Sequence, residues 1–274
     1  MNQAMAILEQ LREKGVIATR LTADSRRVQP GDVFLAFPGA HVDGRDFIAQ
    51  AVANGAAAVI AEQGGKVGAG DTAIVEVAGL AALCGEIAHL VYGRPSEKLW
   101  LAGVTGTNGK TSVSQWIAQA MDTLGQRCAV VGTLGNGFVD ALAESPNTTP
   151  DAITLHAALA GFLEQGATAC AMEVSSIGLD QGRVNGVAFD VAVFTNLTRD
   201  HLEYHGTMEA YAAAKETLFA MPGLGAAVIN LDDAFGVALA HRLRGRLPVL
   251  GYTLGTGAAG TDEVLRAENL RMGA

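Results

Sequence analysis

The sequence predicts an α/β protein in two domains, and two patterns along the chain support this class. Short apolar runs alternate with segments whose apolar residues recur at helical spacing, first over residues 1–94 and again over 95–274. Between these blocks, Gly93-Arg94-Pro95-Ser96 combines residues that end helices and open loops. Continuous apolar strands alternating with helices are typical of a parallel sheet covered on both faces. We therefore expect a small N-terminal α/β domain followed by a mostly parallel-sheet domain.

The same patterns place each element in order. In the first domain we expect helices over residues 2–13, 47–53 and 80–91, and strands over 33–37, 57–61 and 74–77. In the second domain we expect strands over 99–104, 128–132, 168–174, 189–195 and 226–230, and helices over 112–124, 152–165 and 207–220. The residues from Gly251 to Ala274 contain no clear closing strand. We therefore expect the second domain to be incomplete.

Composition indicates a folded, acidic protein. Hydrophobic residues make up 49% of the chain and charged residues 17%, which favours a packed core over disorder. The formal charge of −9 makes duplex nucleic acid and anionic membranes poor partners. Cys84, Cys128 and Cys170 are far apart in apolar surroundings, as expected for thiols of a reducing compartment. No signal peptide or membrane-spanning run is visible, so we expect a cytoplasmic protein.

The segment from Gly103 to Ser112 has the composition of a phosphate-binding loop. It follows an apolar run and precedes a helical pattern, so backbone N–H groups and the positive helix end face an anion. In such a loop the Lys110 ammonium neutralises phosphate charge and the Thr111 hydroxyl ligates Mg²⁺. The commoner motif has glycine where this chain has Val104; the alternative is a glycine-rich turn with an incidental lysine. The residues expected to bind a nucleoside triphosphate are Gly103, Thr105, Gly106, Thr107, Asn108, Gly109, Lys110, Thr111 and Ser112.

Polar residues after later strands are further candidates. Glu173 ends an apolar run, where a carboxylate is costly to bury unless it is paired or binds a cation, so it is either a Mg²⁺ ligand or a surface residue. His201 and His205 are four residues apart and suggest a zinc pair, a single histidine beside phosphate-bound Mg²⁺, or surface residues. Lys215 on an alanine-rich helix is by itself typical of a solvated residue.

Three polar loops are either ordinary turns or ligand contacts. They are Asp24-Ser25-Arg26-Arg27, Asp43-Gly44-Arg45 and Asn147-Thr148-Thr149-Pro150-Asp151. In the last of these, Pro150 and the preceding hydroxyls are typical of a turn that enters a helix. Composition alone leaves both interpretations open.

Taken together, these motifs resemble those of the Mur ligases, the amino-acid-adding enzymes of peptidoglycan precursor synthesis. The resemblance covers nearly the whole chain and is carried by several motifs in order: Asp24-Ser25-Arg26, Gly31-Asp32-Val33-Phe34, Asp43-Gly44-Arg45, the Gly103–Ser112 loop, Asn147-Thr148-Thr149, Met172-Glu173-Val174-Ser175-Ser176 and the segment from Thr195 to Gly206. It implies a UDP-sugar-binding domain over 1–94 and an incomplete ATP-binding domain over 95–274. It also implies a C-terminal amino-acid-binding domain that this chain lacks.

The resemblance also implies a role for each matching residue. Lys110 and the loop would bind ATP, Thr111 and Glu173 would contribute to Mg²⁺ sites, and His201 would ligate a second Mg²⁺. Lys215 matches a lysine that the family carbamylates, and its carbamate would help to hold the metal. The positions that match contacts to the UDP-sugar peptide are Ala23, Ser25, Ala40, His41, Val42, Asn147, Thr148, Thr149, Ser175, Gln181 and Arg183.

The implied reaction is ATP-dependent ligation through an acyl phosphate. The substrates would be UDP-MurNAc-L-Ala-D-Glu and a diamino acid, either meso-diaminopimelate or L-lysine, and the protein would be a monomer. The chain departs from many relatives at Ile177, where they have histidine, and it lacks the domain that closes over the site. We therefore expect this chain alone to bind nucleotide weakly and not to complete ligation. The alternatives are a non-catalytic nucleotide- or UDP-sugar-binding module and another Mur-type ligase.

Overall fold

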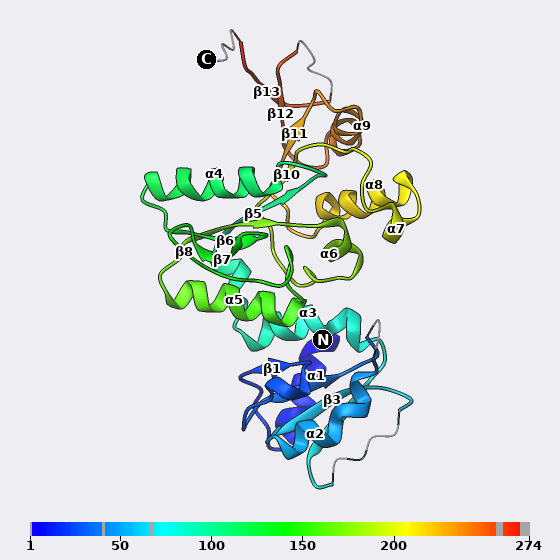
Figure 1. Cartoon of the computed structure of the whole chain (residues 1–274). Coiled ribbons are helices and arrows are strands. Elements are labelled where there is room, and N and C mark those ends of the chain that lie inside the picture. The colour runs from blue at the N-terminus through cyan, green and yellow to red at the C-terminus, as the bar shows by residue number, and fades with distance from the viewer. Residues whose placement is uncertain (1, 40–41, 66–67, 69, 256–259, 269–274) are drawn as a thin grey trace. The chain divides into compact units, whose positions relative to one another are not determined.

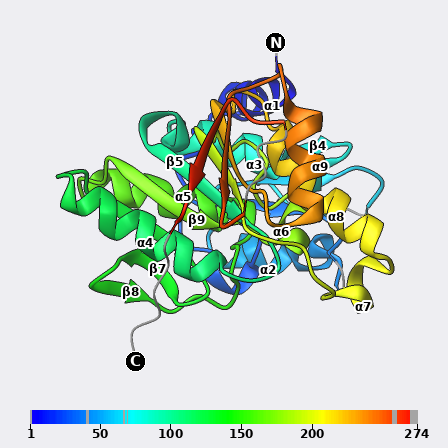
Figure 2. The same ribbon diagram turned by 90° about the horizontal axis from the view of Figure 1, so that it is seen from above.

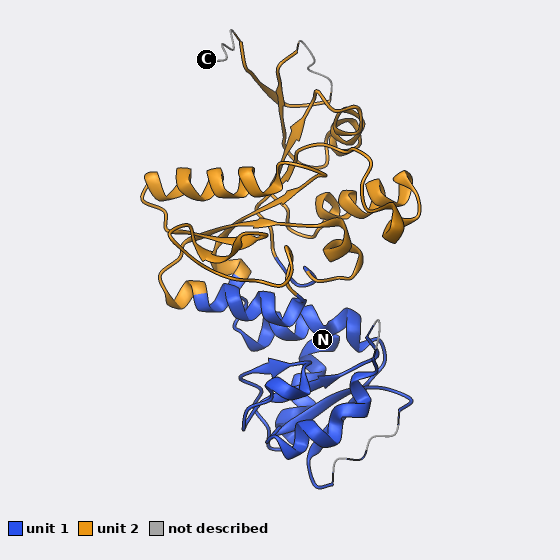
Figure 3. Cartoon of the chain, in the orientation of Figure 1, with its two compact units in different colours: residues 1–95, 151–161, 184–187 blue, residues 96–150, 162–183, 188–274 orange. Residues whose placement is uncertain are grey.

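The computed structural model describes residues 2–39, 42–65, 68, 70–255 and 260–268. The chain divides into two compact units (Figure 1; Figure 3). Unit 1 comprises residues 1–95, 151–161 and 184–187, and unit 2 comprises residues 96–150, 162–183 and 188–274. Each unit contains a sheet of mainly parallel strands with helices, which confirms the predicted α/β class. In the part of the chain that the structure describes, no helix is both long and apolar enough to cross a membrane.

Unit 1 is built on a four-stranded parallel sheet in the order β1-β2-β3-β4. The strands are β1 (Leu21–Thr22), β2 (Val33–Ala36), β3 (Ala58–Glu62) and β4 (Ala73–Val77). The main helices are α1 (Gln3–Glu13), α2 (Ile48–Ala53) and α3 (Leu80–Val91), with short 3₁₀ turns at Ser25–Arg27 and Gly44–Phe47. Each predicted strand and helix of this block forms within two residues of its expected bounds.

Alternate side chains of β2 separate the core of unit 1 into two clusters. Val33 and Leu35 pack with apolar residues of α1 and α3, whereas Phe34 and Ala36 pack with α2. All four side chains are at most 1% exposed. Because neighbouring side chains of a strand point to opposite faces, an uninterrupted apolar strand requires cover on both sides. This explains why the helices of unit 1 are divided between the two faces of its sheet.

Two later segments also pack with unit 1, although the sequence analysis assigned all of 95–274 to the second domain. Residues 151–161 and 184–187 belong to unit 1. Ile153 joins the cluster between the sheet and α1 and α3. His156 contacts the His89 ring with centroids 5.3 Å apart, and its Nε2 lies 3.0 Å from the carbonyl oxygen of Asn185. Sequence periodicity identifies a helix here but does not identify its packing partner.

Lowering the pH should destabilise the chain through His156. The side chain is fully buried, and burial, with a smaller contribution from His89, lowers the pKa of His156 to about 4. The unfolded chain takes up this proton near pH 6.5, so stability falls as the pH drops from about 6.5 towards 4. Linkage gives a loss of about 2 kcal/mol between pH 7 and pH 5. Urea unfolding at both pH values should show this loss, and His156→Gln should reduce the difference by that amount. An unchanged pH dependence in the variant would contradict this assignment.

Unit 2 contains a nine-stranded sheet in the order β13-β12-β11-β10-β5-β9-β6-β7-β8. The strands are β5 (Trp100–Thr105), β6 (Cys128–Gly132), β7 (Gly135–Phe138), β8 (Ala141–Ala143), β9 (Ala169–Glu173), β10 (Val191–Phe194), β11 (Ala226–Asn230), β12 (Val249–Thr253) and β13 (Glu263–Arg266). The helices of this unit are α4 (Lys110–Thr123), α6 (Ser176–Asp180), α7 (Leu202–His205), α8 (Met208–Glu216) and α9 (Ala234–Leu243), with 3₁₀ turns at Pro95–Lys98 and Thr217–Ala220. Helix α5 (Ala152–Glu164) belongs to unit 1 up to residue 161, and its last three residues belong to unit 2. All strand pairs are parallel except β6 with β7 and β7 with β8.

Strand β5 lies inside this sheet, between β9 and β10. After β5 the chain builds β6 and β9 on one side and then β10, β11, β12 and β13 on the other. In open α/β sheets, ligands bind beyond the carboxyl ends of the strands where the chain changes direction in this way. The topology therefore makes the loop after β5 the expected centre of a site.

The end of the described chain differs from the prediction. The sequence analysis found no closing strand after Gly251, but β12 and β13 extend the sheet there in parallel (Figure 2). β12 is only alternately buried and β13 is mostly exposed, so neither has the continuous apolar run of the inner strands. The hairpin of β7 and β8 was also missed, because Gly135 and Gly137 lie in it with φ of +128° and +142°. Glycine-rich sequence weakens the strand signal.

Candidate phosphate-binding site

The loop between β5 and α4 depends on two glycines. Gly106 has φ +148° and Gly109 has φ +85°, both in the region that favours glycine. At Gly106, a side chain would also collide with Thr195 Oγ1. Gly109 is the N-cap of α4, so Lys110 is the first residue of the helix. The first N–H groups of α4 are therefore available to an anion at the positive end of the helix.

The segment after β10 holds this loop from the side. Thr195 Oγ1 donates to the carbonyl oxygen of Asn108 (2.6 Å) and to that of Thr105 (3.3 Å). The Thr107 N–H donates to the carbonyl of Asn196 (2.8 Å), and the Asn108 N–H donates to the Asn196 side-chain oxygen (3.0 Å). Since β10 pairs with β5, these two segments leave the sheet side by side. Protein partners alone thus fix the loop backbone.

Two lysines converge on the carbonyl of Gly106. Lys110 Nζ donates to the carbonyl oxygens of Gly106 and Thr107, both at 2.9 Å, and Lys215 Nζ donates to the same Gly106 oxygen at 2.9 Å. Lys215 is only 1% exposed, so the solvated alternative is wrong. Burial, reinforced by the charge of Lys110, lowers the pKa of Lys215 to about 7. Burial also lowers the pKa of Lys110, against the opposing effect of Glu173. The site therefore contains a lysine amine that is substantially neutral near pH 7.

Glu173 is a buried carboxylate at the end of β9, and the surface alternative is wrong. It is 1% exposed and accepts a hydrogen bond from Thr111 Oγ1 (2.9 Å). Thr133 donates to it twice, through its backbone N–H (2.8 Å) and its hydroxyl (3.2 Å). A side chain at Gly132 would collide with the carboxylate, so glycine is required beside it. Glu173 and Thr111 thus bring two oxygen ligands together beside the loop.

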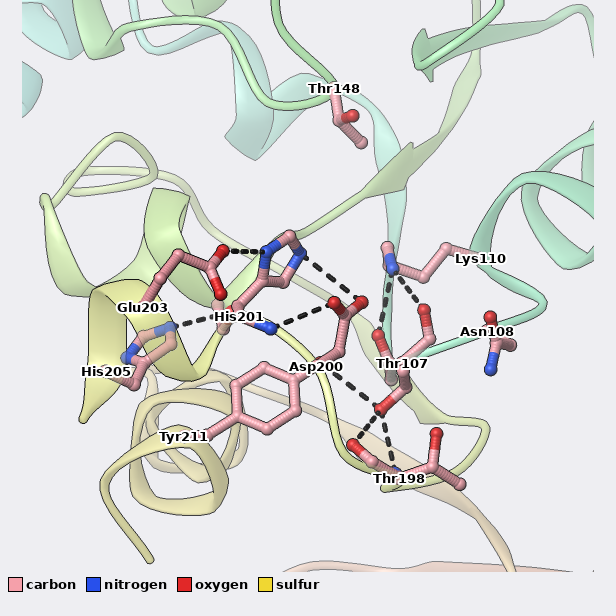
Figure 4. A network of polar contacts seen from close by, with 12 residues as sticks. Thr107, Asn108, Lys110, Thr148, Thr198, Asp200, His201, Glu203, His205 and Tyr211 are labelled. Atoms are coloured by element: carbon pink, nitrogen blue, oxygen red, sulfur yellow. Dashed lines mark hydrogen bonds and ion pairs between the residues drawn. The ribbon is translucent and has the colours of Figure 1, made fainter. Parts of the chain in front are cut away.

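The segment after β10 adds a second polar group beside Lys110, which Figure 4 shows. His201 lies with Nε2 3.6 Å from Asp200 Oδ2 and Nδ1 3.5 Å from Glu203 Oε1. Its φ is +51°, a conformation that costs a non-glycine residue free energy and is found most often at functional sites. His205 points elsewhere, with Nε2 3.0 Å from Ser176 Oγ. The two histidines therefore have different protein partners.

The oxygen atoms beside the loop are ligands of the kind that Mg²⁺ takes. Among the described residues, no group of three or more His, Cys, Asp and Glu side chains is arranged to hold a metal ion. Mg²⁺ is commonly held by one or two carboxylates together with waters and substrate phosphates. The buried Glu173 carboxylate and the Thr111 hydroxyl, at the mouth of a phosphate loop, match that requirement.

Most residues predicted to contact a sugar-peptide substrate lie together in unit 2. Thr149 Oγ1 donates to the carbonyl of Glu173 (3.0 Å) and also bonds Ser175. Arg183 donates to the Thr149 carbonyl (2.8 Å) and to the side chain of Gln181 (2.7 Å). Thr148 is joined to Thr133 through their hydroxyls (3.0 Å). Hydrogen bonds thus connect this group to the Glu173 region. Asn147 lies in the loop that precedes Thr148.

The remaining predicted residues belong to unit 1. Ser25 is buried and donates to the Gln50 side chain (2.8 Å), and Val42 is 61% exposed. Ala23 lines a pocket of about 890 Å³ together with Arg20, Arg27 and Tyr92. Ala40 and His41 lie outside the described residues.

Thr133 and Tyr211 were not found from the sequence, and Thr195 was noted only as the first residue of the Thr195–Gly206 motif, with no role. Thr133 bonds Glu173 twice, Thr195 fixes the loop, and Tyr211 contacts both Thr107 and Lys215. Thr133 and Thr195 each follow an apolar strand directly, so the rule that singled out Glu173 also applies to them. Tyr211 lies four residues before Lys215 on one helix, a spacing that places both on the same face.

A lysine–threonine loop that begins a helix, next to a buried carboxylate at the carboxyl end of an inner parallel strand, defines a phosphate-loop nucleotide-binding protein. The model of the Mur ligase middle domain matches residues 104–272, and that of the Mur ligase family catalytic domain matches residues 7–92. The chain belongs to the Mur ligase family.

Individual relatives agree with this assignment. UDP-N-acetylmuramoyl-L-alanyl-D-glutamate–2,6-diaminopimelate ligase of Ectopseudomonas mendocina is 57% identical over 90% of this chain and 51% of that protein. The ligase of the same name from Pseudomonas aeruginosa is 59% identical over 83% of this chain and 47% of its own length. A solved structure with that name matches with TM-score 0.74 and 38% identity, over 89% of this chain and 50% of the other. The chain thus spans about half the length of the relatives it matches.

Proposed function

We propose that the protein is an ATP-dependent ligase that adds a diamino acid to UDP-MurNAc-L-Ala-D-Glu during peptidoglycan precursor synthesis. The observation that carries the proposal is the buried Glu173 carboxylate joined to Thr111 beside the lysine of the phosphate loop. The names of the similar proteins support the same substrates. We favour meso-diaminopimelate, which those names specify, over L-lysine. The proposal places the protein in the cytoplasm, as a monomer, in cell-wall biogenesis and so in cell shape, cell division and the cell cycle.

The phosphate loop would hold the ATP phosphates. The first N–H groups of α4 and the Lys110 ammonium supply positive charge on one side of the γ-phosphate. To bind phosphate, Lys110 must leave the carbonyls of Gly106 and Thr107, which it contacts now. Once it has exchanged these hydrogen bonds, the ammonium can stay close to the negative charge of the transferred phosphoryl group. Stabilising that charge in the transition state is the main task of a phosphoryl-transfer enzyme.

Glu173 and Thr111 would hold one Mg²⁺, and His201 would hold a second. When bound, the ions neutralise phosphate charge and orient the phosphoryl oxygens. Thr133 keeps the Glu173 carboxylate in place with two hydrogen bonds, so that carboxylate is oriented before a ligand arrives. His201 is held between Asp200 and Glu203.

Lys215 would act as a carbamate. Its neutral amine would add to CO₂, forming an N–C bond and releasing one proton, and the product is an anion. Counted from the ammonium form two protons leave, so an anion replaces a cation. A pKa of about 7 makes the neutral amine abundant. The change also replaces repulsion between Lys215 and Lys110 at the Gly106 carbonyl by attraction.

Ligation would then need no side-chain nucleophile. A D-glutamate carboxylate oxygen attacks the γ-phosphorus, the bond from that phosphorus to the ADP oxygen breaks, and an acyl phosphate forms. An amine of the diamino acid attacks the acyl carbon, and phosphate leaves. Thr148, Thr149, Ser175, Gln181 and Arg183 lie in one hydrogen-bonded group with Glu173, which supports their assignment to the sugar-peptide substrate. Asn147 and, in unit 1, Ala23, Ser25, Ala40, His41 and Val42 complete the proposed substrate contacts.

The metal assignment is tested with Glu173→Gln, which keeps the size of the side chain and removes its charge. Calorimetry of the 274-residue chain should show that Mg²⁺ tightens ATP binding at least tenfold and that the variant loses this gain, because an anionic oxygen ligand is gone. Exposed Glu209→Gln, in the first turn of α8, is the matched control. An equal Mg²⁺ effect in Glu173→Gln and the parent would contradict the assignment.

The reaction itself is tested in the protein at the length that its gene encodes. ADP release should require UDP-MurNAc-L-Ala-D-Glu and a diamino acid together. Release driven by UDP-MurNAc alone or by a folate would contradict the proposed substrates. ATP binding without any turnover would favour the non-catalytic alternative.

A further inference from the structure

Tyr211 is a buried side chain that contacts three parts of the site: the phosphate loop, Lys215 and the two histidines. It is 0% exposed on α8, and its hydroxyl lies 3.2 Å from Thr107 Oγ1 in the phosphate loop. Lys215 Nζ lies 4.4 Å from the centre of its ring. The rings of His201 and His205 lie 6.1 Å and 5.3 Å from it. Figure 4 shows Tyr211 between the histidines and Thr107. We propose that Tyr211 is a positioning residue that fixes the phosphate loop through Thr107 and places Lys215 beneath it.

The contacts of Thr107 support the first part of this proposal. The Thr107 hydroxyl accepts from the Thr198 N–H (2.9 Å) and lies 3.2 Å from both the Thr198 carbonyl and the Tyr211 hydroxyl. The residue is 9% exposed, so its side chain is surrounded by protein. Thr107 was expected to bind ATP, but this hydroxyl is already committed to the segment after β10 and to α8. Its side chain therefore holds the loop in shape.

The placement of Lys215 by Tyr211 depends on their position on one face of α8. Tyr211 and Lys215 are four residues apart within Met208–Glu216, so the aromatic ring lies beside the lysine chain. The aromatic face lies against the end of the lysine chain and limits where Nζ can go, whether the amine is charged or neutral. The amine is thereby held at the Gly106 carbonyl, one residue before Thr107. One side chain thus sets the distance between the loop and the lysine.

If Tyr211 only filled space in the core, its replacement by phenylalanine would have little effect on the loop. A buried tyrosine that only fills space tolerates phenylalanine, because the ring and nearly all of its contacts remain. Fixing the loop through Thr107 requires the hydroxyl, so Tyr211→Phe separates that role from space filling, whereas Tyr211→Leu also removes the ring that holds Lys215. Tyr252→Phe is the matched control: Tyr252 also has one hydrogen bond, to the Phe194 carbonyl (3.4 Å), and contacts no residue of the loop in the described part of the chain.

The first experiment measures hydrogen exchange of the loop amides in the ligand-free chain, and so does not depend on the proposed function. Tyr211→Phe should speed exchange at residues 106–109, Thr107→Val should do the same, and Tyr252→Phe should leave it unchanged. Parental exchange rates in Tyr211→Phe would overturn the proposal, including when the variant is less stable to heat.

The second experiment measures ATP·Mg²⁺ affinity by calorimetry and rests on the proposed function. Losing one hydrogen bond that shapes the loop should raise the Kd about fivefold in Tyr211→Phe. The double variant with Thr107→Val should bind no worse than the weaker single variant, because both remove one interaction. Unchanged affinity, or additive losses, would overturn the proposal. If the parent and Tyr252→Phe also fail to bind ATP, nucleotide binding by this chain is contradicted, and the loop-positioning role then stands or falls on the exchange experiment.

Discussion

Replacing Lys110 with alanine should weaken the binding of ATP·Mg²⁺ to this chain about 100-fold. The ammonium lies over the loop, where it donates to the Gly106 and Thr107 carbonyls. On ATP binding it would exchange these for phosphate oxygens, and a charge-assisted hydrogen bond contributes about 1.5–3 kcal/mol. Calorimetry measures the change in Kd directly, and Lys110→Arg should recover only part of it, because the guanidinium is larger and planar.

Lys98→Ala is the control for this prediction. Lys98 is exposed in the 3₁₀ turn before β5, so its removal changes the net charge equally without touching the loop. A comparable loss of affinity in both variants would mean that overall charge, and not Lys110, attracts the nucleotide. Thermal unfolding of Lys110→Ala should stay close to that of the parent.

Gly106→Ala should produce the largest loss of stability among single changes in the loop, about 3–4 kcal/mol. Alanine at φ +148° is strained, and its Cβ would collide with Thr195 Oγ1 and press on the backbone of Asn196. Strain of this kind costs about 1–2 kcal/mol and overpacking about 1–3 kcal/mol more. Because Thr195 also fixes Asn108, relieving the clash would displace the loop and abolish ATP binding.

Gly125→Ala is the control that separates the cost of backbone strain at positive φ from the cost of the steric clash with Thr195. Gly125 also has positive φ, at +78°, but a Cβ there would meet nothing within 4 Å. We expect it to cost only the strain, about 1 kcal/mol, and to leave ATP affinity unchanged. Urea unfolding of both variants gives the two costs. Equal destabilisation would show that the contact with Thr195 does not matter.

The fold was predicted well from the sequence at strands that are buried at every position. Strands such as β6 and β9 are apolar at every position because helices or other elements cover both faces, and this produces an unambiguous run. The exposed edge strand β13 lacks that run and was missed. The packing of Ile153 with unit 1 was also missed, because periodicity shows that a helix face is apolar but not which element covers it.

The candidate site was predicted in part for a similar reason. Lys110 and Thr111 belong to a continuous motif, so their proximity follows from the sequence. Glu173 could be placed at a strand end, but its contact with Thr111 depends on β9 lying beside β5. Composition alone assigned Lys215 to solvent. Its burial depends on α8 packing against the loop, which no local pattern of alanines reveals.

Residues 151–161 and 184–187 belong to unit 1, and this limits how the chain can be divided into fragments. The chain passes between the units at 95–96, 150–151, 161–162, 183–184 and 187–188, so no single cut yields either unit whole. A fragment that stops at residue 95 would leave its apolar cluster without Ile153 and would expose the neighbours of that side chain to water. The two units are interleaved along the polypeptide. An expressed fragment that keeps either unit intact must therefore contain residues of both of them.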